Sequence, residues 1–325
     1  MRVRAIQIDH VGGPDVMKLV DVELAEPGPG EIVVRHRACG INFIDIYHRT
    51  GLYKVPLPAV LGEEGAGVVE AVGANVTHLA AGDRVAYTTG TPGSYSEARV
   101  VDARTVVKLP DSIGFDTAAA MMLKGLTAQY LLKRVRHELV AGDFLVWHAA
   151  AGGVGLIACQ WARALGYRVI ATAGSREKCE LALANGAAHA IDYRTEDVAL
   201  RVREIAGGKV KAVFDSVGKD TWERSLDCLQ PFGLMVSFGN ASGPVPPVAL
   251  GQLGAKGSLY VTRPSLPAFT SSSEATQAMA DDLFAVVNDG SVTISVERRY
   301  PLADAARAHA DLEARTTTGS GILVP

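Results

Sequence analysis

A run of small residues, Ala-Ala-Ala-Gly-Gly-Val-Gly at positions 149–155, follows an apolar stretch at 144–147 and precedes a helix-like stretch. Small residues permit a tight turn, let backbone amides approach a pyrophosphate and point a helix N-terminus at its negative charge. A glycine triplet by itself would equally suit a close crossing of helix and strand with no ligand. The strand before it and the helix after it favour a dinucleotide site, with Ala150, Gly152 and Gly155 on the spacing of the fingerprint.

The segment about 20 residues beyond the glycines indicates which dinucleotide binds. Enzymes that use NAD place a carboxylate there, which accepts hydrogen bonds from the ribose hydroxyls. This sequence has Thr-Ala-Gly-Ser-Arg-Glu-Lys at 172–178, so no acid ends the strand. Ser175 can donate a hydrogen bond and Lys178 supplies a cation, which together suit the 2′-phosphate of NADPH. The alternative is that Arg176 and Lys178 are solvated charges in a first helical turn, where the helix dipole disfavours cations.

The elements that would position these residues follow two patterns. Up to about residue 110, short β-like runs alternate with turns rich in Gly and Pro, which predicts a compact antiparallel barrel or sandwich. After about residue 125, apolar strands alternate with helices, which predicts a parallel sheet covered on both faces, and the last strand can return to the first domain. Gly166 and Gly186 stand where two helices should end. We expect strands at 144–147, 168–171, 190–192, 212–214 and 234–238 and helices at 156–165, 176–184 and 196–205.

Composition narrows the classes of protein. The 325 residues are enough for about two domains, and 48% of them are hydrophobic, as in globular proteins. A net charge of −3 with no long basic run argues against a specific nucleic-acid partner. The four cysteines form no C-x-x-C pair, so neither a disulfide framework nor a cysteine zinc site is predicted. The N-terminal residues lack an export signal and the apolar stretch at 144–161 contains His148 and Gln160, so we expect a cytoplasmic protein without a membrane span.

Eight motifs extend along the chain: GINFIDIYHRTGLY at 40–53, LGEEGAGVVEAVG at 61–73, AGDRV at 81–85, LKGLTA at 123–128, HAAAGGVGLIACQWA at 148–162, DSVGKDTWERSLDCLQ at 215–230, GLMVSFGNASG at 233–243 and GSLYVTRPSL at 257–266. In order and length they resemble those of the zinc-free quinone oxidoreductases of the medium-chain dehydrogenase/reductase superfamily, the group that includes ζ-crystallin. The bacterial NADPH:quinone reductases are the most similar. The resemblance covers essentially the whole chain.

This resemblance implies a GroES-like β-barrel catalytic domain at 1–124 and 266–325 and a Rossmann doubly wound parallel-sheet domain, which binds NADPH, at 125–265. A quinone would bind in the cleft between them. Zinc alcohol dehydrogenases of the superfamily have a cysteine and a histidine where this sequence has Asn42 and Glu63, and it also lacks their four-cysteine lobe. Because a catalytic zinc needs three such ligands and a structural zinc generally four, we expect no metal. The neighbouring carboxyl groups of residues 63 and 64 should point in opposite directions, as a structural or solvated pair.

The resemblance also implies the residues of the site. Asn42 and Asp45 would lie beside the nicotinamide, and Tyr47 and Tyr53 would line the substrate mouth, although ordinary packing explains the two tyrosines equally well. The remaining residues would bind the cofactor: Thr127 near the nicotinamide ribose, Gly152, Gly153 and Val154 at the pyrophosphate, Ser175, Lys178, Tyr193 and Arg315 around the 2′-phosphate, Gly174 also in contact, Ser216 at the adenosine edge, and Phe238, Gly239, Val261 and Arg263 over the nicotinamide side. For Arg263 an interdomain ion pair is an alternative role.

Two other functions remain open from the sequence. The same hydride donor and zinc-free site can serve the reduction of an α,β-unsaturated carbonyl. The chain could instead be a non-enzymatic nucleotide- or RNA-binding, crystallin-like protein, although the intact glycine turn argues against loss of the cofactor. Residues 257–263 follow the Rossmann strands and could form an open edge strand, which together with the resemblance predicts a homodimer.

Overall fold

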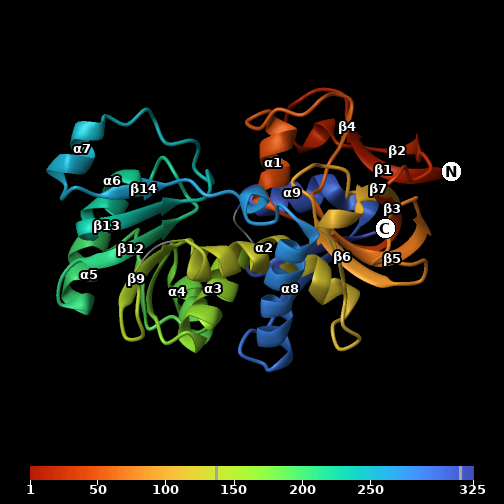
Figure 1. The fold of residues 1–325 in the computed structure, drawn as a ribbon. Helices are drawn as coiled ribbons and strands as arrows, with labels where there is room; N and C mark the ends of the chain where they lie inside the picture. Colours follow the sequence, from red (N-terminus) through yellow and green to blue (C-terminus); the bar gives the residue numbers. More distant parts are fainter. Residues whose placement is uncertain (136–137, 315–316) are drawn as a thin grey trace. The chain divides into compact units, whose positions relative to one another are not determined.

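The computed structural model describes residues 1–135, 138–314 and 317–325, which form two compact units. The first unit contains Met1–Leu126, Leu266–Asp289 and Ile294–Pro325, and the second contains Thr127–Ser265 and Gly290–Thr293. The sequence colours of Figure 1 show that the first unit takes both ends of the chain, whereas the second is built from its middle.

The first unit is built on short, mostly antiparallel strands, as the turn-rich sequence before residue 110 predicts. The larger sheet has the order β15-β16-β3-β5-β6-β8, with β7 also paired to β3, and the smaller has the order β2-β1-β4. Only β15 and β16 pair in parallel among these strands. The strands are β1 (Arg2–Ile8), β2 (Lys18–Glu23), β3 (Glu31–Gly40), β4 (Ala59–Val60), β5 (Glu64–Val72), β6 (Arg84–Thr88), β7 (Ala98–Asp102), β8 (Val106–Lys108), β15 (Val296–Pro301) and β16 (Ser320–Val324).

Strand β3 is the centre of the first unit. Its alternate residues Ile32 and Val34 are fully buried against Val69 of β5 and Val85 of β6, as the period of two in a strand requires. The last strand, β16, returns to it with Leu323 opposite Cys39, which confirms the predicted return of the tail. The helices of this unit are α1 (Phe43–Thr50), the first part of α2 (Phe115–Lys133), α8 (Ser273–Asn288) and α9 (Ala305–Glu313).

The second unit contains a six-stranded sheet of order β11-β10-β9-β12-β13-β14, and every pair in it is parallel. This confirms the predicted doubly wound sheet, whose order reverses between β9 and β12, the place where such folds bind their ligands. The strands are β9 (Phe144–His148), β10 (Arg168–Ala173), β11 (His189–Asp192), β12 (Val210–Asp215), β13 (Leu229–Ser237) and β14 (Tyr260–Thr262). The helices that follow them are α3 (Gly153–Ala164), α4 (Arg176–Ala184), α5 (Val198–Ala206), α6 (Trp222–Asp227) and α7 (Leu250–Ala255).

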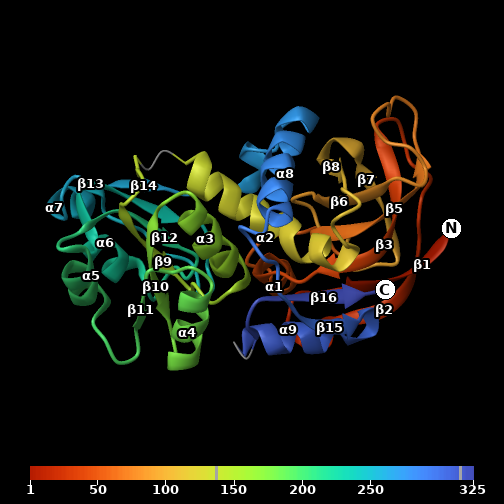
Figure 2. The same cartoon turned by 90° about the horizontal axis from the view of Figure 1, so that it is seen from below.

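Helices lie on both faces of this sheet (Figure 2). Val198 of α5 and Trp222 of α6 pack on one face, against Val146, Ile170 and Val213 of three neighbouring strands. Helices α3 and α4 contact each other and β10 on the opposite face. Their ends are as predicted, because the glycines that follow them, at 166 and 186, have left-handed φ angles of 81° and 99°. Throughout the described residues, every helix is too short or too polar to cross a bilayer.

Candidate active site

The small-residue turn joins β9 directly to the N-terminus of α3. Ala149 adopts a left-handed φ of 53°, and Gly152 is the N-cap of the helix. A side chain at Gly155 would place its Cβ 2.5 Å from the carbonyl oxygen of Ala150, so only glycine allows the helix to pass this close to the turn. The predicted pyrophosphate residues at 152–154 therefore lie where the first N–H groups of a helix have no acceptor within it.

The predicted 2′-phosphate residues meet at the end of β10. The strand ends at Ala173 without an acid, and Ser175 caps α4 by accepting a hydrogen bond from the backbone N–H of Lys178 at 3.3 Å. A Cβ on Gly174 would collide with the Tyr193 hydroxyl, so this glycine lets that phenol reach the turn. The structure thus brings three of the four predicted residues together, with Gly174 beside them. The fourth, Arg315, lies outside the described residues.

The carboxyl group of Glu177 is also hydrogen-bonded to the Ser175 hydroxyl at this turn. Hydrogen bonds from its own backbone N–H and from the Ser175 hydroxyl lower the pKa of the exposed Glu177 carboxyl group. The turn therefore already holds one anionic group, which shows that its donors suit a negative charge.

A buried polar network that the sequence did not reveal lies under these loops. Asp215 ends β12, and its carboxylate accepts hydrogen bonds from Val217 N at 2.7 Å and Ser225 Oγ at 2.8 Å. His148, at the end of β9, lies between Ser225 Oγ at 3.0 Å and Thr172 Oγ1 at 2.8 Å. The network joins the carboxyl ends of three strands and holds the loop that contains the predicted adenosine residue, Ser216.

The residues predicted for the nicotinamide side gather at the ends of β13 and β14. Arg263 donates to Ser237 Oγ at 3.0 Å and to the carbonyl oxygen of Gly239 at 2.9 Å. The ring of Phe238 lies 5.6 Å from that of Trp147, and Val261 is partly exposed on the edge strand. Thr127 lies in α2, where its side chain hydrogen-bonds with Tyr130.

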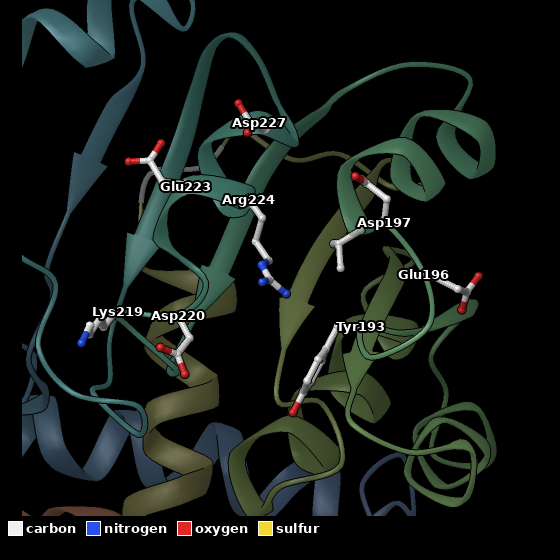
Figure 3. A pocket seen from close by; sticks show the side chains of 9 residues that line it. Tyr193, Glu196, Asp197, Lys219, Asp220, Glu223, Arg224 and Asp227 are labelled. Carbon is white, nitrogen blue, oxygen red and sulfur yellow. The ribbon is translucent and has the colours of Figure 1, made fainter.

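A hollow of about 500 Å³ opens beside Tyr193 in the second unit (Figure 3). Arg224 and Lys219 are the cations in its lining, and carboxylates outnumber them. Of the predicted site residues described, only Tyr193 lines it, so sequence reasoning missed the rest. The lining residues are Tyr193, Glu196, Asp197, Val198, Lys219, Asp220, Glu223, Arg224 and Asp227.

In the first unit, Asn42 and Asp45 form the start of α1. The backbone N–H of Asn42 donates to Asp45 Oδ2 at 2.8 Å, and the Tyr95 hydroxyl donates to the same oxygen at 2.8 Å. Burial raises the pKa of the fully buried Asp45 to about 7. The Asn42 amide donates to Glu64 Oε2 at 2.8 Å. Asp45 has no exposed surface, and its hydrogen bond to the backbone N–H of Asn42 fixes the start of the helix.

The adjacent carboxyl groups at 63 and 64 point to different partners, as predicted, but neither is solvated. Glu64 accepts from the backbone N–H of Leu123 at 2.8 Å and lies 3.6 Å from Nζ of Lys124, whereas Glu63 lies 3.4 Å from His48 Nε2. Burial raises the pKa of Glu64, and the nearby ammonium opposes this rise. The sequence did not predict the pairing of Lys124 with Glu64, because the two residues are 60 positions apart and no motif connects them.

The two predicted substrate tyrosines lie together on the first unit. Tyr47 and Tyr53 meet edge to face with ring centroids 5.2 Å apart, and Tyr53 is the more exposed. The ring of His48 lies 6.1 Å from that of Tyr53. Among residues 1–135, 138–314 and 317–325, no three His, Cys, Asp or Glu side chains are grouped to hold a metal ion.

A parallel dinucleotide sheet with a glycine turn, in one chain with an antiparallel GroES-like unit, defines a medium-chain dehydrogenase/reductase. Comparisons with known families agree: a model for the "Alcohol dehydrogenase GroES-like domain" matches residues 28–111, and one for "Zinc-binding dehydrogenase" matches residues 153–281.

Individual relatives indicate which family within this superfamily the chain belongs to. The chain is 56% identical over 324 residues to a quinone oxidoreductase of Pseudomonas aeruginosa, covering 99% of each protein. It is 50% identical to the Escherichia coli quinone oxidoreductase whose structure was solved with NADPH, with a TM-score of 0.97 over 99% of this chain and 100% of that one. It is also 43% identical to a 2-haloacrylate reductase of Burkholderia, over 99% of each. The chain belongs to the quinone oxidoreductase family of this superfamily.

Proposed function

We propose that this protein is an NADPH:quinone oxidoreductase that transfers a hydride from NADPH to a quinone without a metal ion. The observation that carries the proposal is the near-full-length identity of 56% to a quinone oxidoreductase. The E. coli relative, at 50% identity, was solved with NADPH. We assign catalysis to residues 1–124 and 266–325 and cofactor binding to residues 125–265.

The residues of the second unit fit NADPH. The first turn of α3 offers backbone N–H groups to a pyrophosphate, and the turn at Ser175 and Lys178 offers a hydroxyl and an ammonium where NAD enzymes have an acid. Carboxylates dominate the hollow beside Tyr193, so it suits the amino-bearing adenine ring rather than a phosphate. NADPH supplies the hydride when bound, and the described residues bind and orient it.

The first unit supplies a site for a flat, electrophilic acceptor. A quinone carbonyl needs less activation than a simple ketone, so orientation and hydrogen bonds to the developing oxyanion are the main contributions of the protein. We assign these to the amide of Asn42 and to Tyr47 and Tyr53, whose rings can stack on the substrate and whose hydroxyl groups can donate. Asn42 and Glu63 stand where zinc enzymes of the superfamily have ligands, and an amide at that position does not suit zinc.

Steady-state assays test this proposal. We expect NADPH binding by fluorescence titration, and NADPH oxidation that is strongly stimulated by 1,4-benzoquinone and unchanged by EDTA. NADH should serve less well. Loss of activity with the chelator, restored by zinc, would contradict the metal-free mechanism. A protein that binds no NADPH would instead favour the non-enzymatic nucleotide- or RNA-binding role.

Reduction of a conjugated carbonyl is a second candidate function. The 43% identity to a 2-haloacrylate reductase favours it, because an activated alkene and a quinone are both conjugated hydride acceptors. An alkenal and a haloacrylate assayed beside the quinone distinguish the two. A higher kcat/KM for the alkene substrates would establish the second function.

We further propose that the protein is a cytoplasmic homodimer. The four cysteines are free, in keeping with a reducing compartment. Strand β14 is the edge of the parallel sheet, and Tyr260 on it is 61% exposed, with Phe232 and Leu250 also exposed. An open strand with apolar side chains is a template for pairing with a second copy.

Sedimentation equilibrium tests the dimer. The wild type should sediment at twice the mass of one chain, and Tyr260→Arg should shift it towards the monomer, because a buried charge opposes association. Leu200→Arg, at an exposed leucine on α5, is the matched control and should remain dimeric. A monomeric wild type would disprove the proposal.

A further inference from the structure

His48, whose ring lies near that of Tyr53, and Glu63 are two buried polar side chains that are close together but incompletely hydrogen-bonded. His48 Nε2 lies 3.4 Å from Glu63 Oε1, and the two side chains are only 7% and 2% exposed. In the described structure, neither His48 Nδ1 nor Glu63 Oε1 has a hydrogen-bond partner. Buried polar atoms are nearly always partnered, so an exception of this kind needs an explanation.

Of the two neighbouring carboxyl groups, Asp45 also has one oxygen without a partner, Oδ1, but both groups accept hydrogen bonds from two donors. Asp45 holds the backbone N–H of Asn42 and the hydroxyl of Tyr95, and Glu64 holds Leu123 N and the amide of Asn42. Both are therefore committed to fixing the start of α1. Glu63 is the one of these three buried carboxyl groups that is not held in this way, so its proton can move.

Burial, together with the charges nearby, determines the protonation of the pair. Burial raises the pKa of Glu63 to about 8, with Asp45 and Glu64 raising it further and Arg99 of β7 opposing them. Burial also lowers the pKa of His48. Near neutral pH the pair therefore consists of a neutral carboxylic acid and a neutral imidazole. The carboxylic acid of Glu63 then has a proton that it can transfer to the imidazole.

We propose that Glu63 and His48 form a proton relay that serves the substrate at Tyr47 and Tyr53. This inference rests on the proposed function. Once a hydride has brought both electrons to the substrate, the resulting oxyanion takes the proton from His48 Nδ1, so an O–H bond forms and an N–H bond breaks. The carboxyl proton of Glu63 moves to His48 Nε2, and water then reprotonates the carboxylate. The relay moves only protons, so the hydride and one proton together give the hydroquinone.

The test compares Glu63→Gln with wild type between pH 6 and pH 10. Glutamine keeps the size of the side chain and removes its transferable proton. The wild-type kcat should fall as pH rises through about 8, where Glu63 loses its proton. The variant should lose about 100-fold in kcat at pH 7, the scale of general acid catalysis, and should lack the descending limb. A solvent deuterium isotope effect on kcat should be present in wild type, and the NADPH dissociation constant should be the same in both.

A second measurement uses the protein without cofactor or substrate. The infrared difference spectrum between wild type and Glu63→Gln should show a protonated carboxyl band that disappears through about pH 8, because the bands of Asp45 and Glu64 are common to both proteins. Glu70→Gln is the matched control, because Glu70 lies in the strand that directly follows Glu63, in an exposed ion pair with Arg35, and it should leave all readouts unchanged.

The outcomes separate the relay from the proposed function. Wild-type kcat, pH profile and infrared spectrum in Glu63→Gln would overturn the relay and leave the quinone reductase activity intact. A wild type that binds NADPH but reduces no quinone would overturn both. If Glu63→Gln does not fold, His48→Asn provides the same comparison of kcat and pH profile, and an unchanged profile there would also overturn the relay.

Discussion

Replacement of Lys178 by glutamate is expected to weaken NADPH binding by about 100-fold and to remove the preference for NADPH over NADH. A hydrogen bond to a charged group contributes about 1.5–3 kcal/mol, and each 1.4 kcal/mol is about tenfold in affinity. Lys178 lies in the first turn of α4, in the segment capped by Ser175, where an acid would stand in an NAD enzyme. A carboxylate there repels the 2′-phosphate but can accept hydrogen bonds from the ribose hydroxyls of NADH.

The control for this prediction lies two residues away. Arg176 is on the same turn, but its side chain is 87% exposed and pairs with Glu180 at 2.9 Å. Arg176→Glu should therefore change the dissociation constant of NADPH by less than about threefold, since exposed charges are strongly screened. Fluorescence titration of both variants with NADPH and NADH measures the effect. Equal losses in the two variants would show that the turn attracts the cofactor only through its general charge.

Most of the second unit could be predicted from the sequence, because its elements are determined by local patterns. The parallel strands are continuous apolar runs, and glycines mark the turns and helix ends. The differences are local as well. Strand β13 begins at Leu229, whereas the sequence predicted a start at residue 234. The predicted start was late because Pro231 and Gly233 are typical of a turn. The strand continues through Phe232, which has a left-handed backbone conformation, and the register of its pairing with β12 shifts between Val210 and Ala212. Helix α3 begins at Gly153, three residues earlier than predicted. The prediction placed the glycines of its first turn in the preceding loop.

The candidate site was less predictable, because its polar contacts join residues far apart in the sequence. The motifs identified Asn42 and Asp45, but not that Asp45 is fully buried under Tyr95. Likewise, nothing near Glu63 in the sequence shows that it faces His48 rather than solvent. The sequence thus supplies the candidate groups, and the fold decides which of them are held and which remain reactive.

Replacement of Lys124 by methionine is expected to lower the free energy of unfolding by about 3–5 kcal/mol at pH 8, since it leaves a buried charge unpaired. Lys124 Nζ lies 3.6 Å from Glu64 Oε2, and the two side chains are 8% and 0% exposed. Methionine fills similar space, so the loss measures charge rather than packing. Lys108→Met is the control, because Lys108 pairs with Asp83 at the surface and should lose less than about 1 kcal/mol.

The pH dependence of this loss identifies its cause. Burial raises the pKa of Glu64 in the folded protein, and removal of the ammonium raises it further. A carboxyl group with a raised folded pKa stabilises the fold below its unfolded pKa, and this contribution is lost as pH rises through the folded pKa. The deficit of Lys124→Met should therefore be largest at pH 8 and shrink as pH falls towards about 4, the unfolded pKa of glutamate. Urea unfolding across this range measures it, and the added substitution Glu64→Gln should recover most of the loss at pH 8. A deficit that is independent of pH, or no larger than that of Lys108→Met, would mean that the ammonium does not compensate the buried carboxylate.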